Sequence, residues 1–176
     1  QGLTDQQISD TISEMKKEGF DAFKMKVGQD INHDIERLTF IRKQIGEESK
    51  LMTDCNQVLG VEEAIEYMKK LSKFNITWIE EPTARDDVQG HLEIAKALEP
   101  YGIKVATGEQ VQSPVIFKQL LKSGAIGYCQ IDASRMGGVN DVLAVILLAK
   151  KFNVPVCPHG GGTVSYTHLT LPTSQL

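Results

Sequence analysis

The sequence predicts an α/β fold that forms part of a TIM-like (β/α)8-type barrel, with about six βα units. Helical apolar periodicity alternates with short β-type runs along the chain, which is typical of parallel strands joined by helical crossovers. Polar residues follow the end of each run, as expected where barrel strands meet at one mouth. An open doubly wound sheet would carry a G-x-G-x-x-G sequence after an early strand, and none occurs.

Capping residues and glycines mark where several helices begin and end. Thr4 with Gln7 forms a capping-box pattern, and Gly19 follows the end of that helix. Ser113 followed by Pro114 is typical of a helix start. Six helices are expected, over 4–18, 31–45, 61–71, 92–98, 114–121 and 139–148. The last is so apolar that we expect it to be buried.

Each helix leads into a short apolar run of the length of a strand. Pro82 stops the third of these runs, because proline cannot donate a hydrogen bond to a sheet. The six strands are expected over 22–27, 51–54, 76–80, 103–107, 125–131 and 154–157.

Composition and charge narrow the class of protein. Of the 176 residues, 41% are hydrophobic, which excludes a disordered chain, and the 3 cysteines cannot all pair. The longest apolar run, 142–149, is too short to span a bilayer. Acidic and basic residues are interspersed and the net charge is −4, so we expect neither a membrane nor a nucleic acid as partner. A small molecule is the expected ligand.

Polar side chains recur at or just after the strand ends, 23 to 29 residues apart from Lys26 onward. This spacing corresponds to one βα unit, so a barrel would bring the side chains to one mouth. They are Lys24 and Lys26, Asp54 and Asn56, Glu80 and Glu81, Glu109, Asp132 and His159.

Three of these residues predict a metal site. Asp54, Glu80 and Glu109 supply one carboxylate from each of three consecutive strands. Clustered carboxylates repel one another unless a cation lies among them. Oxygen ligands favour a hard cation, and Mg²⁺ binds few carboxylates while keeping positions for water and substrate. The sequence therefore predicts Mg²⁺ as the cofactor.

Acid–base groups are expected on either side of this metal. Lys24 and Lys26 are two residues apart on a strand and point to the same side, which we expect to be the barrel interior. An inward lysine needs an acidic partner. Asp132 and His159 end two later strands and can pair, with the carboxylate orienting the imidazole. The predicted site has a base, a metal and an acid in that order.

Six motifs in this order resemble the barrel domain of the enolase superfamily, mandelate-racemase subgroup. The likeness is strongest to dehydratases of L-fuconate and to the mitochondrial members found in animals, and it runs from about 2 to 164. The motifs are Lys24-x-Lys26, Asp54-x-Asn56, Trp78-Ile79-Glu80-Glu81-Pro82, Thr107-Gly108-Glu109-Gln110, Gln130-Ile131-Asp132 with Gly137-Gly138, and Cys157-Pro158-His159-Gly160-Gly161-Gly162.

The resemblance implies a Mg²⁺-dependent acid-sugar dehydratase, a carbon–oxygen lyase that removes an α-proton through an enediolate and expels the β-hydroxyl as water. Members of the superfamily use a Lys or His base, with Mg²⁺ stabilising the enediolate, and the resemblance carries this chemistry over. It implies that the three carboxylates ligate Mg²⁺ and that Lys26 takes the proton. His159, oriented by Asp132, would assist departure of the hydroxyl.

The resemblance also implies the residues that contact the substrate. Lys24 would be an electrostatic partner of Lys26 and of the substrate carboxylate, and it would lower the pKa of Lys26. Asn56 and Glu81 would contact the substrate, a small acid sugar. We expect a homo-oligomer for a full-length parent and an intracellular location, mitochondrial or cytosolic.

The same resemblance predicts an incomplete domain. Residues 1–164 would form a barrel domain without the family's capping domain and last strand, and 165–176 an atypical tail in which His168 is incidental. Six of eight strands cannot close a barrel, so we expect the chain alone to be inactive. Three other interpretations stay open: another racemase or dehydratase of the superfamily, a non-catalytic truncated isoform, and an unrelated phosphate-binding barrel that uses Gly160–Gly162.

Overall fold

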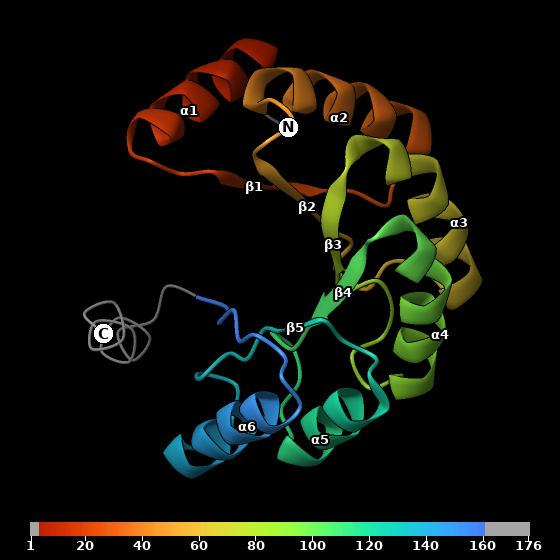
Figure 1. Ribbon diagram of the computed structural model, residues 1–176, viewed down its shortest axis with the longest axis vertical. Helices are drawn as coiled ribbons and strands as arrows, with labels where there is room; N and C mark the ends of the chain where they lie inside the picture. Colours follow the sequence, from red (N-terminus) through yellow and green to blue (C-terminus); the bar gives the residue numbers. More distant parts are fainter. Residues whose placement is uncertain (1–3, 161–176) are drawn as a thin grey trace.

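A parallel five-stranded sheet with helices on one side forms the framework of the chain (Figure 1). This computed structural model describes residues 4–160. The strands pair in sequence order and are β1 (Ala22–Lys26), β2 (Lys50–Asp54), β3 (Ile76–Glu80), β4 (Lys104–Thr107) and β5 (Tyr128–Cys129). The sheet is curved, with its strands on the concave side and the helices on the convex side. The prediction of a partial barrel built from parallel βα units is confirmed for this part of the chain.

The helices begin and end close to their predicted positions, except that the fourth begins at Val88 rather than at 92. Thr4 caps the first helix through a capping box with Gln7, and Ser113 caps a later one through the backbone N–H of Val115, as the sequence predicts. The helices are α1 (Asp5–Lys17), α2 (Ile31–Ile45), α3 (Val61–Leu71), α4 (Val88–Leu98), α5 (Pro114–Ser123) and α6 (Val139–Lys151), with short 3₁₀ turns at Ser72–Phe74 and Glu99–Tyr101.

The last two predicted strands are shorter than expected. The stretch predicted over 125–131 forms β5 only at Tyr128–Cys129, because Ala125 still donates to Leu120 in the turn that ends α5. The stretch predicted over 154–157 forms a single parallel bridge between Val156 and Cys129. Pro155 has no N–H to donate, although its carbonyl accepts from Cys129 and the pairing continues to His159, which donates to Ile131.

The two faces of the sheet carry different side chains. Residues such as Leu51, Ile79 and Val105 face the helices and belong to the main hydrophobic core. Met52, Trp78 and Ala106 form a second, small cluster. Because successive residues of a strand point to opposite faces, this second cluster lies on the concave face, which is also the face of Lys24, the register partner of Met52.

Helix α6 is less buried than its apolar sequence predicts. It buries Val145 and Ala149 against the core and packs beside α5. Its other side exposes Val139, Leu143, Ile146 and Leu147. The prediction of a buried helix is therefore wrong for the side that carries these four residues, because residues 4–160 cover α6 along one side only. Among residues 4–160 no helix is long and apolar enough to cross a membrane. The tail predicted over 165–176 lies outside the described residues.

Candidate active site

The two lysines of β1 point away from the helices, as predicted. Met25 and Val27, at the alternate positions, are buried in the main core. The Lys24 ammonium lies 2.5 Å from Glu80 Oε1 and 3.6 Å from Asp54 Oδ2, so it bridges the ends of β2 and β3. The Lys26 ammonium lies 3.1 Å from Asp54 Oδ2 and also donates to the side-chain oxygen of Asn56.

The two lysines differ in their surroundings. Burial lowers the pKa of Lys24, but the hydrogen bond to Glu80 and the charges of Glu80, Asp54 and Glu109 outweigh it, so the net pKa is raised. The side chain of Lys26 is 68% exposed, against 37% for Lys24. Lys24 is thus held within the carboxylate cluster, whereas Lys26 is open to a ligand.

Backbone turns at the strand ends direct several of the predicted side chains. Asn56, Gln57 and Glu81 have left-handed backbones, with φ of 45°, 63° and 44°, which is unusual for residues other than glycine. Gln57 Nε2 donates to Glu81 Oε1 over 2.9 Å. Burial and the nearby charges of Glu109 and Asp54 raise the pKa of Glu81 to about 7. Negative charge is therefore concentrated at this edge of the sheet.

The predicted Asp–His pair is formed at the far side of the sheet. His159 Nδ1 lies 2.8 Å from Asp132 Oδ2, and its Nε2 lies 3.3 Å from Glu109 Oε2. Ser134 donates from its backbone N–H and its hydroxyl to Asp132 Oδ1, over 2.8 and 2.6 Å. Burial raises the pKa of Asp132, but the bonds from Ser134 and His159 together outweigh it, so that the net pKa is below its usual value. The carboxylate that orients the imidazole is therefore kept ionised.

The three carboxylates predicted to bind a metal lie at the ends of β2, β3 and β4. Among residues 4–160, no three acidic, histidine or cysteine side chains are arranged as a ready metal-binding group. Lys24 occupies the space between Asp54 and Glu80, and Glu109 faces His159. A cationic ammonium between two carboxylates shows that the space suits a positive charge. The donors are all oxygens, so they fit a hard divalent cation such as Mg²⁺.

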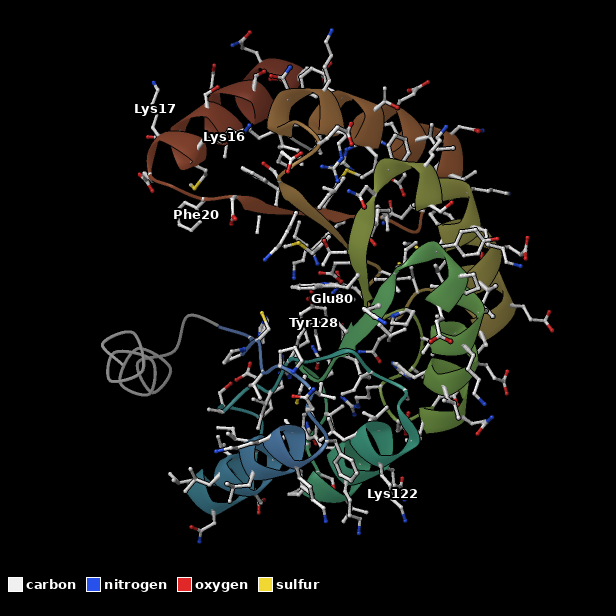
Figure 2. All side chains as sticks on the ribbon, in the orientation of Figure 1. Lys16, Lys17, Phe20, Glu80, Lys122 and Tyr128 are labelled. Carbon is white, nitrogen blue, oxygen red and sulfur yellow. The ribbon has the colours of Figure 1, made fainter. Side chains whose placement is uncertain are left out.

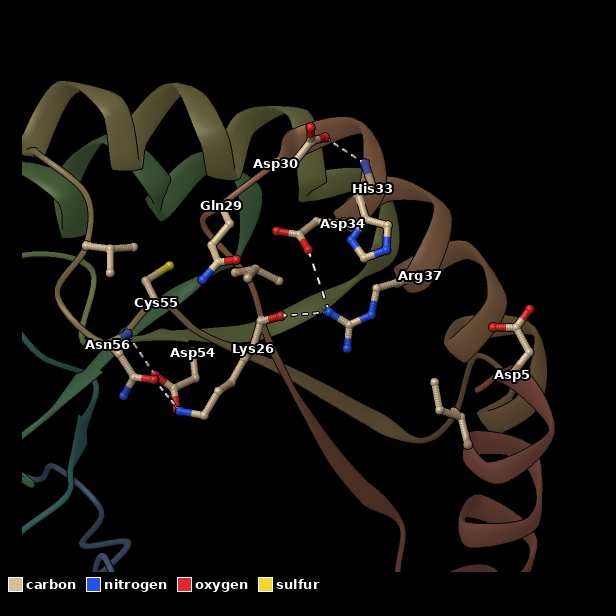
Figure 3. Close-up of a pocket in the computed structure, with 13 residues that line it drawn as sticks. Asp5, Lys26, Gln29, Asp30, His33, Asp34, Arg37, Asp54, Cys55 and Asn56 are labelled. Atoms are coloured by element: carbon tan, nitrogen blue, oxygen red, sulfur yellow. Dashed lines mark hydrogen bonds and ion pairs between the residues drawn. The ribbon is translucent and has the colours of Figure 1, made fainter. Parts of the chain in front are cut away.

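A pocket adjoins the lysine end of this site (Figure 3). It has a volume of about 590 Å³ and is lined from α1, α2 and the loops that follow β1 and β2. Lys26, Asp54 and Asn56 form its boundary with the site, and His33 and Arg37 line the wall from α2. The lysine that is open to a ligand therefore faces a polar space.

Two side chains of the site were not predicted from the sequence. Gln130 donates from Nε2 to Glu80 Oε2 over 2.7 Å, and Gln57 holds Glu81. The period of two on a strand was the signal for Gln130, because it places Gln130 on the same face as Asp132. Gln57 lies in a loop, where no periodicity applies.

Curved parallel strands with acidic and basic side chains at their carboxyl ends define an enzyme-like site of the barrel class. The chain belongs to the enolase C-terminal domain-like family, whose sequence pattern it matches over residues 7–175. The resemblance inferred from the motifs is thereby confirmed at the level of the family.

Relatives and solved structures agree with this assignment. Mitochondrial enolase superfamily member 1 of Bos taurus is 52% identical over 161 residues, which are 92% of this chain and 36% of the relative. L-galactonate dehydratase of Hypocrea jecorina is 50% identical over 163 residues, with the same two coverages of 92% and 36%. The chain therefore spans about a third of the length of these curated relatives.

Crystal structures of relatives match the fold. Human mitochondrial enolase superfamily member 1 superposes with a TM-score of 0.89 at 51% identity, over 92% of this chain and 37% of that chain. L-talarate dehydratase of Polaromonas sp. JS666, complexed with Mg and L-glucarate, gives a TM-score of 0.84 at 31% identity, over 96% of this chain and 46% of that chain. A dehydratase crystallised with Mg is thus among its structural relatives.

Proposed function

We propose that the chain carries the catalytic barrel segment of a Mg²⁺-dependent acid-sugar dehydratase. The observation that carries this proposal is the order of charged groups across the sheet: two lysines on β1, carboxylates after β2, β3 and β4, and the Asp132–His159 pair beyond β5. Relatives named L-galactonate dehydratase and L-talarate/galactarate dehydratase support the reaction class.

The metal would be held by the three carboxylates of Asp54, Glu80 and Glu109. When bound, Mg²⁺ would neutralise the negative charge that develops on the substrate carboxylate as its α-proton leaves. Binding would require Lys24 to give up its position between Asp54 and Glu80, which would leave the ammonium free to meet an anionic substrate.

The proton transfers are assigned to the two ends of the site. Lys26 Nζ would accept the α-proton, and the electron pair of that C–H bond would form the new Cα–Cβ double bond. His159 Nε2 would donate a proton to the departing β-hydroxyl, which leaves as water. Asp132 would keep the imidazole oriented, and Asn56 and Glu81 would bind substrate hydroxyl groups.

We propose that the substrate is a small acid sugar. Within this class we propose L-fuconate, because the motifs resemble those of L-fuconate dehydratases. We also propose that the 176-residue chain alone gives no more than trace turnover, since residues 4–160 supply a five-stranded sheet and a bridge rather than a closed barrel.

The proposal predicts that a complete dehydratase stays active when the matching segment of its barrel is replaced by residues of this chain. Residues 4–160 would replace the matching segment of L-galactonate dehydratase, which is 50% identical. We expect this chimaera to dehydrate L-galactonate or L-fuconate with Mg²⁺. Lys26→Ala or His159→Asn should lower kcat by about 100-fold or more, because each removes a proton-transfer group, and this is the order expected for general acid–base catalysis.

Lys122→Ala, at an exposed position of α5, is the matched control, and we expect it to leave kcat unchanged. Exchange of the α-hydrogen with deuterium from solvent should be lost with Lys26→Ala and kept with His159→Asn. Exchange without dehydration in the parent chimaera would indicate a racemase instead. Full turnover after either substitution would refute the assigned roles.

A further inference from the structure

The carboxylate of Glu80 is held by donors on both of its oxygens. Its side chain is fully buried. Lys24 donates to Oε1, whereas Oε2 accepts from Trp78 Nε1 over 3.3 Å and from Gln130 Nε2 over 2.7 Å. Figure 2 shows Glu80 and Tyr128 on the concave side of the sheet. The two carboxylate oxygens thus have different partners: Oε2 faces two fixed N–H groups, and Oε1 faces the lysine.

The hydrogen bond from Gln130 to Glu80 spans the width of β4. Gln130 follows β5 and Glu80 ends β3, so β4 lies between them. Glu80 pairs with Ala106 of β4, and Ala106 belongs to the cluster on the concave face. This small residue leaves room for the longer side chain to cross. A Cβ atom at Gly108 would lie 2.9 Å from the backbone of Gln130 and from a ring carbon of Phe117, so the chain after β4 approaches Gln130 this closely only with glycine.

The orientation of the Gln130 amide is set by Glu80. A carboxylate can only accept hydrogen bonds, so the amide nitrogen must face it. The Oε1 atom of Gln130 is then buried without a hydrogen-bond partner among residues 4–160. An unpaired buried carbonyl is unfavourable. The single hydrogen bond to Glu80 is therefore the polar contact that determines how this side chain is placed.

We propose that Gln130, together with Trp78, is a positioning residue for the metal site. The two N–H groups hold Oε2 of Glu80, so that Oε1 stays directed toward the space that Lys24 occupies beside Asp54 and is the oxygen that would bind a divalent cation. This inference rests on the proposed function, because it assumes that Glu80 is a metal ligand. It adds that the geometry of this ligand is set from β5, two strands away.

Trp78 makes the inference testable without any assay of activity. It is the only tryptophan of the chain, and its indole N–H contacts Glu80. Binding of Mg²⁺ at Glu80 should therefore change the fluorescence of Trp78. We expect Gln130→Met, which keeps the volume and removes the donor, to raise the Mg²⁺ dissociation constant of the full chain about tenfold, as is usual when a partner of a metal ligand is removed.

Gln130→Leu is the second variant, since its side chain has no hydrogen-bond donor and does not titrate. Gln89→Met, on the exposed side of α4, is the matched control and should leave the dissociation constant unchanged. Calorimetric titration with MgCl₂ and thermal unfolding without metal accompany each fluorescence titration, so that loss of folding is recognised separately.

The outcomes separate the two proposals. Weaker Mg²⁺ binding in both Gln130 variants, with normal binding in the control, supports the positioning role. Normal binding in either folded Gln130 variant, even with lowered thermal stability, overturns that role and leaves the proposed function standing. Absence of Mg²⁺ binding by the unsubstituted chain overturns the metal assignment and the positioning role with it.

Discussion

At the scale of single residues, the guanidinium of Arg42 joins three segments of backbone. It donates over 2.8 to 3.1 Å to the carbonyl oxygens of Phe74, Asn75, Gly46 and Ser49. No carboxylate among the described residues lies within ion-pair distance of it, and burial lowers its pKa. A planar group with five N–H donors is suited to such divergent acceptors.

Arg42→Lys is expected to destabilise the fold although the charge is retained. An ammonium has three donors and cannot reach all four carbonyls, so buried acceptors are left unpaired, at a cost of about 3 kcal/mol in the free energy of unfolding. Urea unfolding followed by circular dichroism measures this loss. Arg85→Lys, at an exposed position, is the control. Equal unfolding midpoints for the two variants would contradict the structural role of Arg42.

A second residue-scale prediction concerns pH. His91 is fully buried in α4; Nδ1 donates to the carbonyl of Asp87, and Nε2 has no partner among the described residues. Burial lowers its pKa below the usual 6.5, so the unfolded chain binds a proton more readily than the folded one. This contribution to stability is complete above about pH 6.5 and is lost as the pH falls through the folded pKa.

Unfolding at pH values of about 7.5 and 5.5, on either side of the usual histidine pKa, tests this contribution. We expect His91→Gln to lose less stability between these two pH values than the unsubstituted chain does, because glutamine does not titrate. His33→Gln, at an exposed position of α2, should keep the original pH dependence. An unaltered pH dependence in His91→Gln would show that His91 does not titrate in this range.

At the scale of elements, a buried carboxylate ties two helices to the end of β1. Asp34 of α2 accepts from the hydroxyl of Tyr67 on α3 over 2.7 Å and from the backbone N–H of Gly28 over 2.9 Å. Arg37 lies 3.8 Å from the same carboxylate and donates to the carbonyl of Lys26 over 3.4 Å. The backbone that carries Lys26 is therefore supported from two helices.

Tyr67→Phe is expected to lower the free energy of unfolding by about 2 kcal/mol, because it removes a hydrogen bond to a buried charge. Chemical unfolding measures the loss, and Tyr101→Phe, at an exposed tyrosine, is the control. If Tyr67→Phe unfolded at the same urea concentration as the control, the carboxylate of Asp34 would not depend on this contact.

At the scale of the whole molecule, the strand order explains why residues far apart in sequence share one site. Every strand is parallel to its neighbour and pairs with the next in sequence. The carboxyl ends therefore lie along one edge, and a spacing of one βα unit was enough to predict that Lys26, Asp54, Glu80 and His159 share it. The Asp132–His159 hydrogen bond was predictable for the same reason.

Other features could not be read from periodicity. Which side of α6 is exposed depends on the neighbouring elements that cover it. The stretch 154–157 forms a single bridge, to Cys129, and the number of its bridges depends on the length of the neighbouring strand. The placement of Arg42 depends on carbonyl groups up to 33 residues away. These features arise from contacts between segments, whereas hydrophobic periodicity reports only the local backbone and the face on which a side chain lies.

The sequence by itself determined the alternation of helix and strand, the face of each strand and the order of the charged groups. These follow from local capping, from the period of two and from repeated βα spacing. Only the tertiary structure decided which groups are in contact: Lys24 with Glu80, His159 with Glu109, and Gln130 with Glu80 across β4. The physical reason is that these distances depend on how several strands pair side by side, and for Gln130 on the small Ala106 that lies between, and such pairing is not encoded within a single element.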